Sequence, residues 1–243
     1  MTLKEKTQLS DVIEALDWAA SHYNLNVETI KQQVLEREST VEETTEQAML
    51  YALNHIAMDK PDWTYVAARL YLLNLYKEAA NNRHYNNQDK YGSFYHLIKT
   101  LTDQGIYSND MMNSYTKEEI KQLEREINAK RDHLFNYIGL FLLADRYLAR
   151  DHDGNLYELP QERFMIIAMT LMKQEERTNR LHLVKEAYWA LSNLYMTVAT
   201  PTLTNAGKNY GQLSSCFIDT VEDSLDGIYL NNWDTARLSK DGG

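Results

Sequence analysis

LPQERFMIIAMTLMKQEERTNRLHLVKEAYWALSNLY, residues 159–195, carries the clearest structural signal in this sequence. Pro160 fits the first position of a helix, and the residues after it predict a helix that ends near Lys173. A second helix follows, because apolar residues then recur at helical spacing. They are Leu181, Val184, Tyr188, Leu191 and Tyr195. The stretch therefore predicts two consecutive helices.

Composition extends this prediction to most of the chain. Only 9 of the 243 residues are glycine and 3 are proline, and the first glycine is Gly92. Average usage would give roughly 12% for these two residues together, so helix-breaking positions are rare here. The length is enough for one large domain or two modest ones with real cores. We expect a folded, mainly α protein.

Several protein classes are excluded. No uncharged apolar run approaches the roughly 20 residues that cross a bilayer, and the N-terminus lacks the apolar region of a secretion signal, so we expect a cytoplasmic protein with no membrane partner. The single cysteine, Cys216, cannot form an internal disulfide, and no Cys/His cluster has the spacing of a zinc site. The net charge of −10 argues against a nucleic-acid partner, because duplex binding rests on Lys and Arg.

The first part of the chain is predicted to be an acidic helical module. Residues 1–62 hold five basic and twelve acidic side chains, a balance of −7. Ser10 is expected to cap a first helix, and a capping box at Thr40 and Glu43 to start a later one. Pro61 suits the first position of the next helix. Between the helix at Ser10 and the box at Thr40, apolar periodicity predicts a short helix with Val27, Ile30 and Val34.

The middle of the chain begins after a polar stretch at 81–89, where we place a domain boundary. A second capping box, Thr116 with Glu119, starts a long helical pattern that runs to Ile138 and predicts a core helix. Bulky residues on both sides of Asp151-His-Asp-Gly-Asn155 suggest a hairpin around an Asp-Gly turn. That turn lacks the ligand spacing and the closing Glu of a calcium loop, so we expect no metal site.

From Ala199 onward the character of the sequence changes. This segment gathers five of the nine glycines and the cysteine. It predicts a strand at Leu213–Thr220 and a helix from about Ser224. A lone strand cannot pair its own backbone, so we expect it to pair with a sheet in another chain or in residues that follow Gly243.

Four motifs of this segment occur in a recognisable order: Ala199-Thr-Pro-Thr-Leu-Thr-Asn-Ala-Gly207, Gln212-Leu-Ser-Ser-Cys-Phe-Ile218, Glu222-Asp-Ser-Leu-Asp226 and Leu238-Ser-Lys-Asp-Gly-Gly243. With Leu159-Pro-Gln-Glu162 and the run from Lys185 to Tyr195, they resemble the large subunit of class I ribonucleoside-diphosphate reductase. The resemblance spans nearly the whole chain and is weakest before residue 40. It implies helical N-terminal domains followed by the first strand and helix of a ten-stranded α/β barrel.

The resemblance implies a redox role for Cys216. In this family the strand with Ser-Ser-Cys presents a thiol under the ribose, and two thiols supply the reducing equivalents and end as a disulfide. Cys216 would be the first of these thiols, and its partner would lie on a later barrel strand. Without the resemblance, a lone cysteine on an apolar strand is a small buried hydrophobe.

Thr202, Ser214 and Ser215 are the candidate substrate-binding residues. Their hydroxyls and the nearby N–H groups suit a phosphate or a ribose hydroxyl, and the resemblance implies contact with the nucleoside diphosphate. The alternative is that Thr-Pro-Thr is only a turn and Ser-Ser only a solvated strand end.

Asp223, Ser224 and Leu225 would, by the same resemblance, help to form the effector site that sets substrate choice. The carboxylate of Asp223 would bind a deoxyribose hydroxyl, and the following helix would pack across a homodimer. Ser224 could instead only cap that helix. Gly242-Gly243 would begin the glycine-rich loop beside the effector.

Residues 1–88 align loosely with the family's ATP cone, best from Pro61 to Leu70. The basic, glycine-containing hairpin that opens a cone is missing, and Thr44 stands where cones commonly place a histidine. We therefore expect a degenerate cone that binds ATP weakly or not at all. The other domains would be an all-helical ribonucleotide reductase N-terminal domain at 89–205 and the incomplete start of the catalytic barrel at 206–243.

The resemblance implies an enzyme that reduces ribonucleoside diphosphates to deoxyribonucleotides by radical chemistry. We expect no cofactor in this chain, dNTP and ATP as allosteric effectors, and a metal-containing small subunit that supplies the radical. Partners would be the rest of the large subunit, a second large subunit, and a thioredoxin or glutaredoxin type reductant. As a split-gene product or a truncation, the chain alone would be inactive. The competing hypothesis is a non-enzymatic acidic helical protein that binds a partner through its first module and its 17 tyrosines.

Overall fold

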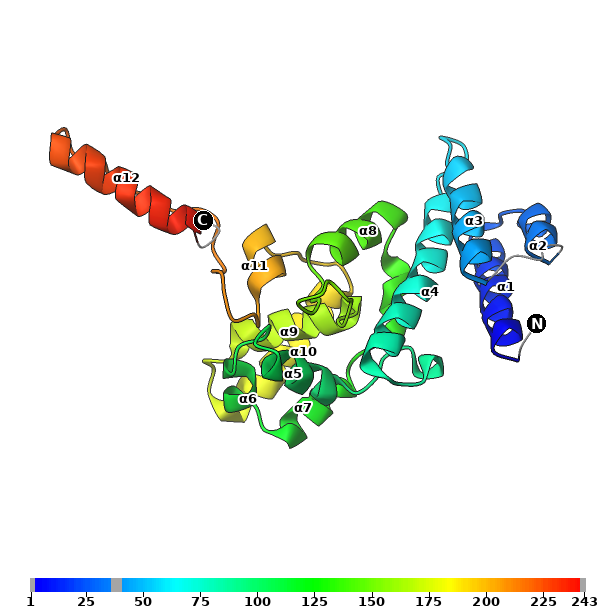
Figure 1. The fold of residues 1–243 in the computed structure, drawn as a ribbon, viewed down its shortest axis with the longest axis horizontal. Coiled ribbons are helices and arrows are strands. Elements are labelled where there is room, and N and C mark those ends of the chain that lie inside the picture. The colour runs from blue at the N-terminus through cyan, green and yellow to red at the C-terminus, as the bar shows by residue number, and fades with distance from the viewer. Residues whose placement is uncertain (1–2, 36–40, 241–243) are drawn as a thin grey trace. The chain divides into compact units, whose positions relative to one another are not determined.

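The computed structural model describes residues 3–35 and 41–240 (Figure 1). Within these ranges the regular structure is helical, with isolated β-bridges and no strand, so the prediction of a mainly α chain is confirmed. None of the described helices has the length and apolar character needed to span a membrane. The α-helices, with the 3₁₀ helices η1 and η2, are α1 (Leu3–Tyr23), α2 (Glu28–Leu35), α3 (Val41–Asn54), α4 (Trp63–Arg83), η1 (Asn87–Asp89), α5 (Phe94–Asp103), α6 (Asp110–Ser114), α7 (Lys117–Glu124), η2 (Ala129–Leu134), α8 (Tyr137–Arg146), α9 (Pro160–Met172), α10 (Arg177–Ser192), α11 (Thr200–Asn205) and α12 (Leu225–Lys240).

The chain divides into two compact units. Unit 1 comprises residues 1–92, 128–150 and 154–161, and unit 2 comprises residues 93–127, 151–153 and 162–243. In unit 1, α1, α3 and α8 each pack against α4 (Figure 1). Small alanine side chains alternate with branched ones in its core, which lets the helices approach closely. The core includes Val12, Leu16, Ala19, Ile30, Val34, Ala48, Ala52, Val66, Ala67 and Leu70.

Unit 2 shows how local capping signals fix helix ends. The hydroxyl of Thr116 accepts from the N–H of Glu119 at 3.2 Å, and the Glu119 carboxylate accepts from the N–H of Thr116 at 2.7 Å. The capping box predicted there is confirmed, and it starts α7. The carboxylate of Glu124, at the end of α7, accepts from the N–H of Phe94 at 2.8 Å and so caps α5. The two helices are thereby fixed to each other.

Three predicted helix starts differ from the structure or lie outside it. Ser10 lies inside α1, which begins at Leu3, so its predicted capping role is wrong. Pro61 precedes α4 by two residues, since that helix begins at Trp63. The box at Thr40 and Glu43 rests on Thr40, which lies outside the described residues.

The long core helix expected from Thr116 to Ile138 is broken into three parts. After α7, the side chain of Asn128 accepts from the N–H of Lys130 at 3.0 Å and starts η2. The side chain of Asn136 then accepts from the N–H of Gly139 at 2.8 Å and starts α8. The prediction of one helix was wrong because asparagine, placed between apolar residues of helical spacing, competes with the helix for backbone groups.

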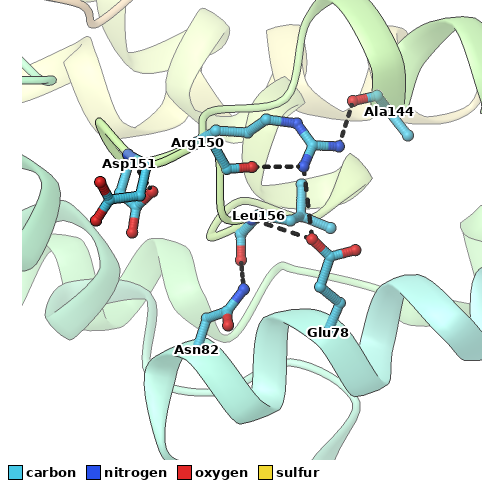
Figure 2. A network of polar contacts seen from close by, with 8 residues as sticks. Glu78, Asn82, Ala144, Arg150, Asp151 and Leu156 are labelled. Atoms are coloured by element: carbon cyan, nitrogen blue, oxygen red, sulfur yellow. Dashed lines mark hydrogen bonds and ion pairs between the residues drawn. The ribbon is translucent and has the colours of Figure 1, made fainter.

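An isolated antiparallel bridge between Arg150 and Leu156 stands where a hairpin was expected. Side chains of α4 take the place of a second strand (Figure 2). The N–H of Leu156 donates to Glu78 Oε1 at 3.2 Å, and Asn82 Nδ2 donates to the Leu156 carbonyl at 2.9 Å. Arg150 Nη1 donates to the Gly154 carbonyl at 2.9 Å and lies 3.5 Å from Glu78 Oε1. The two arms are also joined through main chain, because the N–H of Tyr157 donates to the Ala149 carbonyl at 3.1 Å. The chain therefore turns back as the hairpin prediction required, but its arms form one bridge and no strands.

The last segment corrects another prediction. Residues 213–220, expected as a strand, follow an irregular course, and no β-bridge of the described ranges involves them. A strand needs a neighbouring strand for its N–H and C=O groups, and residues 3–35 and 41–240 offer none to that segment. The helix expected from about Ser224 is present as α12, and none of its residues is buried. The two helices predicted from residues 159–195 are present as α9 and α10.

Candidate functional site

Thr202 lies in α11, the short helix that precedes the irregular segment with Cys216. Its side chain is 8% exposed, and its hydroxyl donates to the carbonyl oxygen of Leu213 at 2.8 Å. Asn205, the last residue of α11, donates from Nδ2 to the carbonyl oxygen of Gln212 at 2.9 Å. The chain turns back toward α11 at Gly211, whose φ of +85° is a conformation that favours glycine. Two of the four motifs are therefore brought together, the one in α11 and the one that contains Cys216.

Ser214, Ser215 and Cys216 directly follow Leu213, and all three are exposed. The hydroxyl of Ser215 lies 3.6 Å from the Cys216 sulfur. Cys216 is an exposed free thiol in this structure. The hydroxyl hydrogen of Thr202 is already used by Leu213, so a ligand would meet that side chain through the acceptor positions of its oxygen.

Asp223, Ser224 and Leu225 lie at the start of α12 and are exposed. The hydroxyl of Ser224 accepts from the N–H of Gly227 at 3.0 Å, so the capping role considered for Ser224 is present. Within the described ranges no hydrogen bond joins these three residues to Thr202 or to residues 214–216. The end of α12 does contact the motif with Cys216, since Gln212 Nε2 donates to the Leu238 carbonyl at 3.4 Å.

One buried cation near this region was missed by the sequence analysis. Arg163 of α9 is 0% exposed, and its Nη2 donates to the carbonyl oxygen of Ala206, the residue after α11. The available signal was a charge next to the apolar run from Phe164 to Met169, all of which is buried. A cation in such surroundings has to find a hydrogen-bond acceptor.

A buried acidic cluster in unit 1 was missed as well. Asp132 accepts hydrogen bonds from Tyr76 OH at 2.5 Å, from Tyr91 OH at 2.8 Å and from Gln161 Nε2 at 2.8 Å. Burial raises the pKa of Asp132 from 3.8 to about 6, although the three hydrogen bonds act in the opposite direction. The next residue, His133, has its pKa lowered to about 4, first by burial and then by the nearby Arg69 guanidinium. The cluster connects three otherwise separate parts of unit 1.

A cavity of about 210 Å³ lies between α2 and α3 of unit 1. Thr44, which occupies the position where a histidine was expected in an ATP cone, is one of its lining residues. None of the lining residues is charged: they are Ile30, Gln33, Val34, Thr44, Gln47, Ala48, Leu50, Tyr51 and Asn54. Throughout the described part of the chain, the cavity included, no three His, Cys, Asp or Glu side chains converge as metal ligands would.

Comparison with known proteins identifies one family and several similar sequences. Residues 133–211 match the family described as ribonucleotide reductase, all-alpha domain. The chain is 36% identical over 228 residues to ribonucleoside-diphosphate reductase subunit alpha of Treponema pallidum (strain Nichols), which covers 93% of this chain and 26% of that protein. Over 226 residues it is 34% identical to subunit alpha of Helicobacter pylori (strain ATCC 700392 / 26695), covering 90% of this chain and 27% of that protein.

A third relative is ribonucleoside-diphosphate reductase 1 subunit alpha of Escherichia coli (strain K12), 31% identical over 232 residues, which cover 92% of this chain and 29% of that protein. The chain thus spans 26–29% of the length of these three relatives, while they match nearly all of it. Residues 133–211 therefore match the ribonucleotide reductase all-alpha domain family, and the chain as a whole is similar to an N-terminal portion of the large subunit, subunit alpha, of ribonucleoside-diphosphate reductase.

Proposed function

We propose that this chain contributes the N-terminal portion of the large subunit of a ribonucleoside-diphosphate reductase and supplies one redox thiol to its active site. The bond from Thr202 to the Leu213 carbonyl is the observation that carries the proposal. It joins α11 to the residue directly before Ser214, Ser215 and Cys216. Substrate-binding hydroxyls and a reducing thiol have to lie in one region for this reaction, and this contact brings the two segments together.

The reaction needs two electrons and two protons. Two thiols supply them as they join in a disulfide, while the 2′ hydroxyl of the ribonucleoside diphosphate leaves as water and a hydrogen takes its place on the 2′ carbon. Cys216 is one such thiol. A disulfide needs a second cysteine, and this chain has none, so the second thiol has to come from another part of the large subunit.

The exposed apolar surface of residues 217–233 supports this proposal. Phe217 is 44% exposed, Ile218 101% and Trp233 55%, whereas apolar side chains of this size are normally buried. Further exposed apolar residues follow the same course: Val221, Leu225, Ile228, Tyr229 and Leu230. We propose that the rest of the large subunit covers them, residues 206–243 forming the first strand and helix of its α/β barrel.

The remaining roles follow from the same proposal. Ser214 and Ser215 bind the nucleoside diphosphate together with Thr202. Asp223 and Leu225 contribute to an effector site for dNTP or ATP, and Ser224 caps α12. A radical-generating small subunit, a second large subunit and a thioredoxin or glutaredoxin type reductant are the proposed partners, and the chain by itself is inactive.

The association is tested by co-expressing this chain with a polypeptide that carries the rest of the large subunit, followed by size-exclusion chromatography. We expect one complex that forms deoxyribonucleotides once the small subunit and a reductant are added. Neither polypeptide alone is expected to do so.

Two well-folded polypeptides that elute separately would overturn the proposal. In that case the acidic helical interaction protein becomes the better explanation, and it makes a distinct forecast. Such a protein is monodisperse alone and unfolds in a single cooperative transition, in spite of the exposed surface of residues 217–233.

A further inference from the structure

Arg163 is a fully buried cation, and one of its hydrogen-bond partners lies 43 residues further along the chain. Arginine is rarely buried completely, and its desolvation is tolerated only where the guanidinium is hydrogen-bonded. Its Nη2 donates to the carbonyl oxygen of Ala206, which directly follows α11. A charged donor on a main-chain carbonyl fixes the backbone at that residue more strongly than a neutral donor would.

The backbone at Ala206 and Gly207 lies along one face of α9. Arg163, Ile166 and Thr170 are spaced three and four residues apart, so they share that face. A Cβ on Gly207 would lie 2.5 Å from Ile166 Cγ2 and 3.7 Å from Thr170 Oγ1. The glycine also has a φ of +77°. Close packing on α9 and a left-handed backbone therefore both require glycine here.

The segment from Ile106 to Ser108 holds the same loop from another direction. The N–H of Ser108 donates to the Gly207 carbonyl at 2.9 Å, and the N–H of Asn209 donates to the Ile106 carbonyl at 3.0 Å. The carbonyl at 206 is thus held by a side chain and the carbonyl at 207 by main chain. Arg163 is the member of this arrangement that a substitution can remove.

The fixed loop continues directly into the candidate substrate region. The N–H of Ala206 donates to the Thr202 carbonyl at 3.2 Å and closes the last turn of α11. Thr202 in turn holds Leu213 through its hydroxyl at 2.8 Å. The position of Ala206 therefore sets that of Thr202, and Thr202 sets the start of the segment with Ser214 and Ser215.

We propose that Arg163 is a positioning residue for nucleoside-diphosphate binding in the large subunit. It touches no substrate. It holds the loop after α11, so that Thr202, Ser214 and Ser215 are in place before the substrate arrives, which lowers the cost of ordering them on binding. This inference rests on the proposed function for its substrate, whereas its account of the loop stands on the structure of unit 2 alone.

The loop is tested first, in this chain, with Arg163→Met, which keeps most of the side-chain volume and removes the donors. Arg180→Met is the matched control, because Arg180 is 4% exposed in the same unit but contacts Tyr115 and Glu119 and not the loop. We expect Arg163→Met to speed amide hydrogen exchange at Ala206, Lys208 and Asn209 by about tenfold or more, as for the loss of one charge-assisted hydrogen bond.

Arg180→Met should leave exchange at these three amides unchanged. Equal acceleration in the two variants would show general loosening of unit 2 and overturn the inference. Should Arg163→Met fail to fold, Arg163→Lys keeps the charge and one donor. In the lysine variant, the exchange rates at these three amides should lie between the wild-type rates and those expected for the methionine variant. Rates equal to wild type in a folded lysine variant would count against Arg163 as the residue that holds the loop.

The function is tested in the complete large subunit by separating KM from kcat. We expect Arg163→Met to raise the KM for the nucleoside diphosphate by about tenfold, corresponding to about 1.4 kcal/mol, with kcat changed far less. Arg163→Lys should recover part of the loss. A fall in kcat at unchanged KM would overturn the positioning role. A wild-type complete subunit that binds no nucleoside diphosphate would instead overturn the proposed function, with the exchange result for the loop still valid.

Discussion

Asp132 and His133 are consecutive residues of η2, and burial opposes the charged form of both. The pKa of Asp132 is raised to about 6 and that of His133 is lowered to about 4. Because its pKa is raised, Asp132 contributes less to the stability of the fold as the pH rises from 3.8 to about 6. Because its pKa is lowered, His133 contributes less to the stability of the fold as the pH falls from 6.5 to about 4. The two neighbours therefore act against each other over the same pH range.

Replacing Asp132 by Asn should expose the histidine contribution. Between pH 3.8 and about 6 the folded wild type keeps a proton on Asp132 that the unfolded chain has released, so raising the pH from 4 to 7 costs the wild type about 2 kcal/mol that the variant does not lose. Urea unfolding at several pH values between 4 and 7 measures this difference in the free energy of unfolding. A difference that does not change with pH would show that Asp132 ionises normally in the folded state.

Replacing Gly207 by Ala should destabilise unit 2 more than the same change at Gly105. Gly105 has a similar φ of +74° but nothing within 4 Å of an added Cβ, so it reports the backbone strain alone, about 1 kcal/mol. At Gly207 the contact with Ile166 adds overpacking of roughly 1–3 kcal/mol. Thermal or urea unfolding of the two variants gives the comparison. Equal losses would mean that the loop is not packed against α9.

The signals that predicted the structure correctly are local ones. The capping box at Thr116 and Glu119 needs only four residues, and Pro160 with its apolar run needs about fourteen, so both could be seen in the sequence. The break of the long helix was missed because Asn128 and Asn136 decide it through single side-chain bonds. Periodicity of apolar residues does not register such bonds.

The features that the sequence did not reveal depend on contacts between distant residues. Arg163 reads as an ordinary surface charge until Ala206 supplies its acceptor. The cluster at Asp132 draws on Tyr76, Tyr91 and Gln161 from other parts of the chain. The prediction of a strand at residues 213–220 was wrong for the same reason. A strand forms only when a second segment pairs with it, and the sequence of one segment does not show whether that partner is present.

ATP should bind this chain weakly or not at all. A triphosphate that enters unit 1 loses hydration and needs cations in return, yet residues 1–62 carry twelve acidic and five basic side chains. The cavity between α2 and α3 offers it only uncharged lining residues. Calorimetric titration of the chain with ATP checks this. Saturable binding in the micromolar range would show that unit 1 holds a nucleotide site by other means.

The redox assignment of Cys216 is tested most directly in the complete large subunit, with Cys216→Ser. Serine keeps the approximate size, so folding and nucleoside-diphosphate binding should survive, and both are measured alongside as controls. It cannot form a disulfide, so deoxyribonucleotide formation with an external reductant should be abolished. Substantial turnover in the Cys216→Ser enzyme would contradict the account, because it would mean that this thiol does not supply the reducing equivalents.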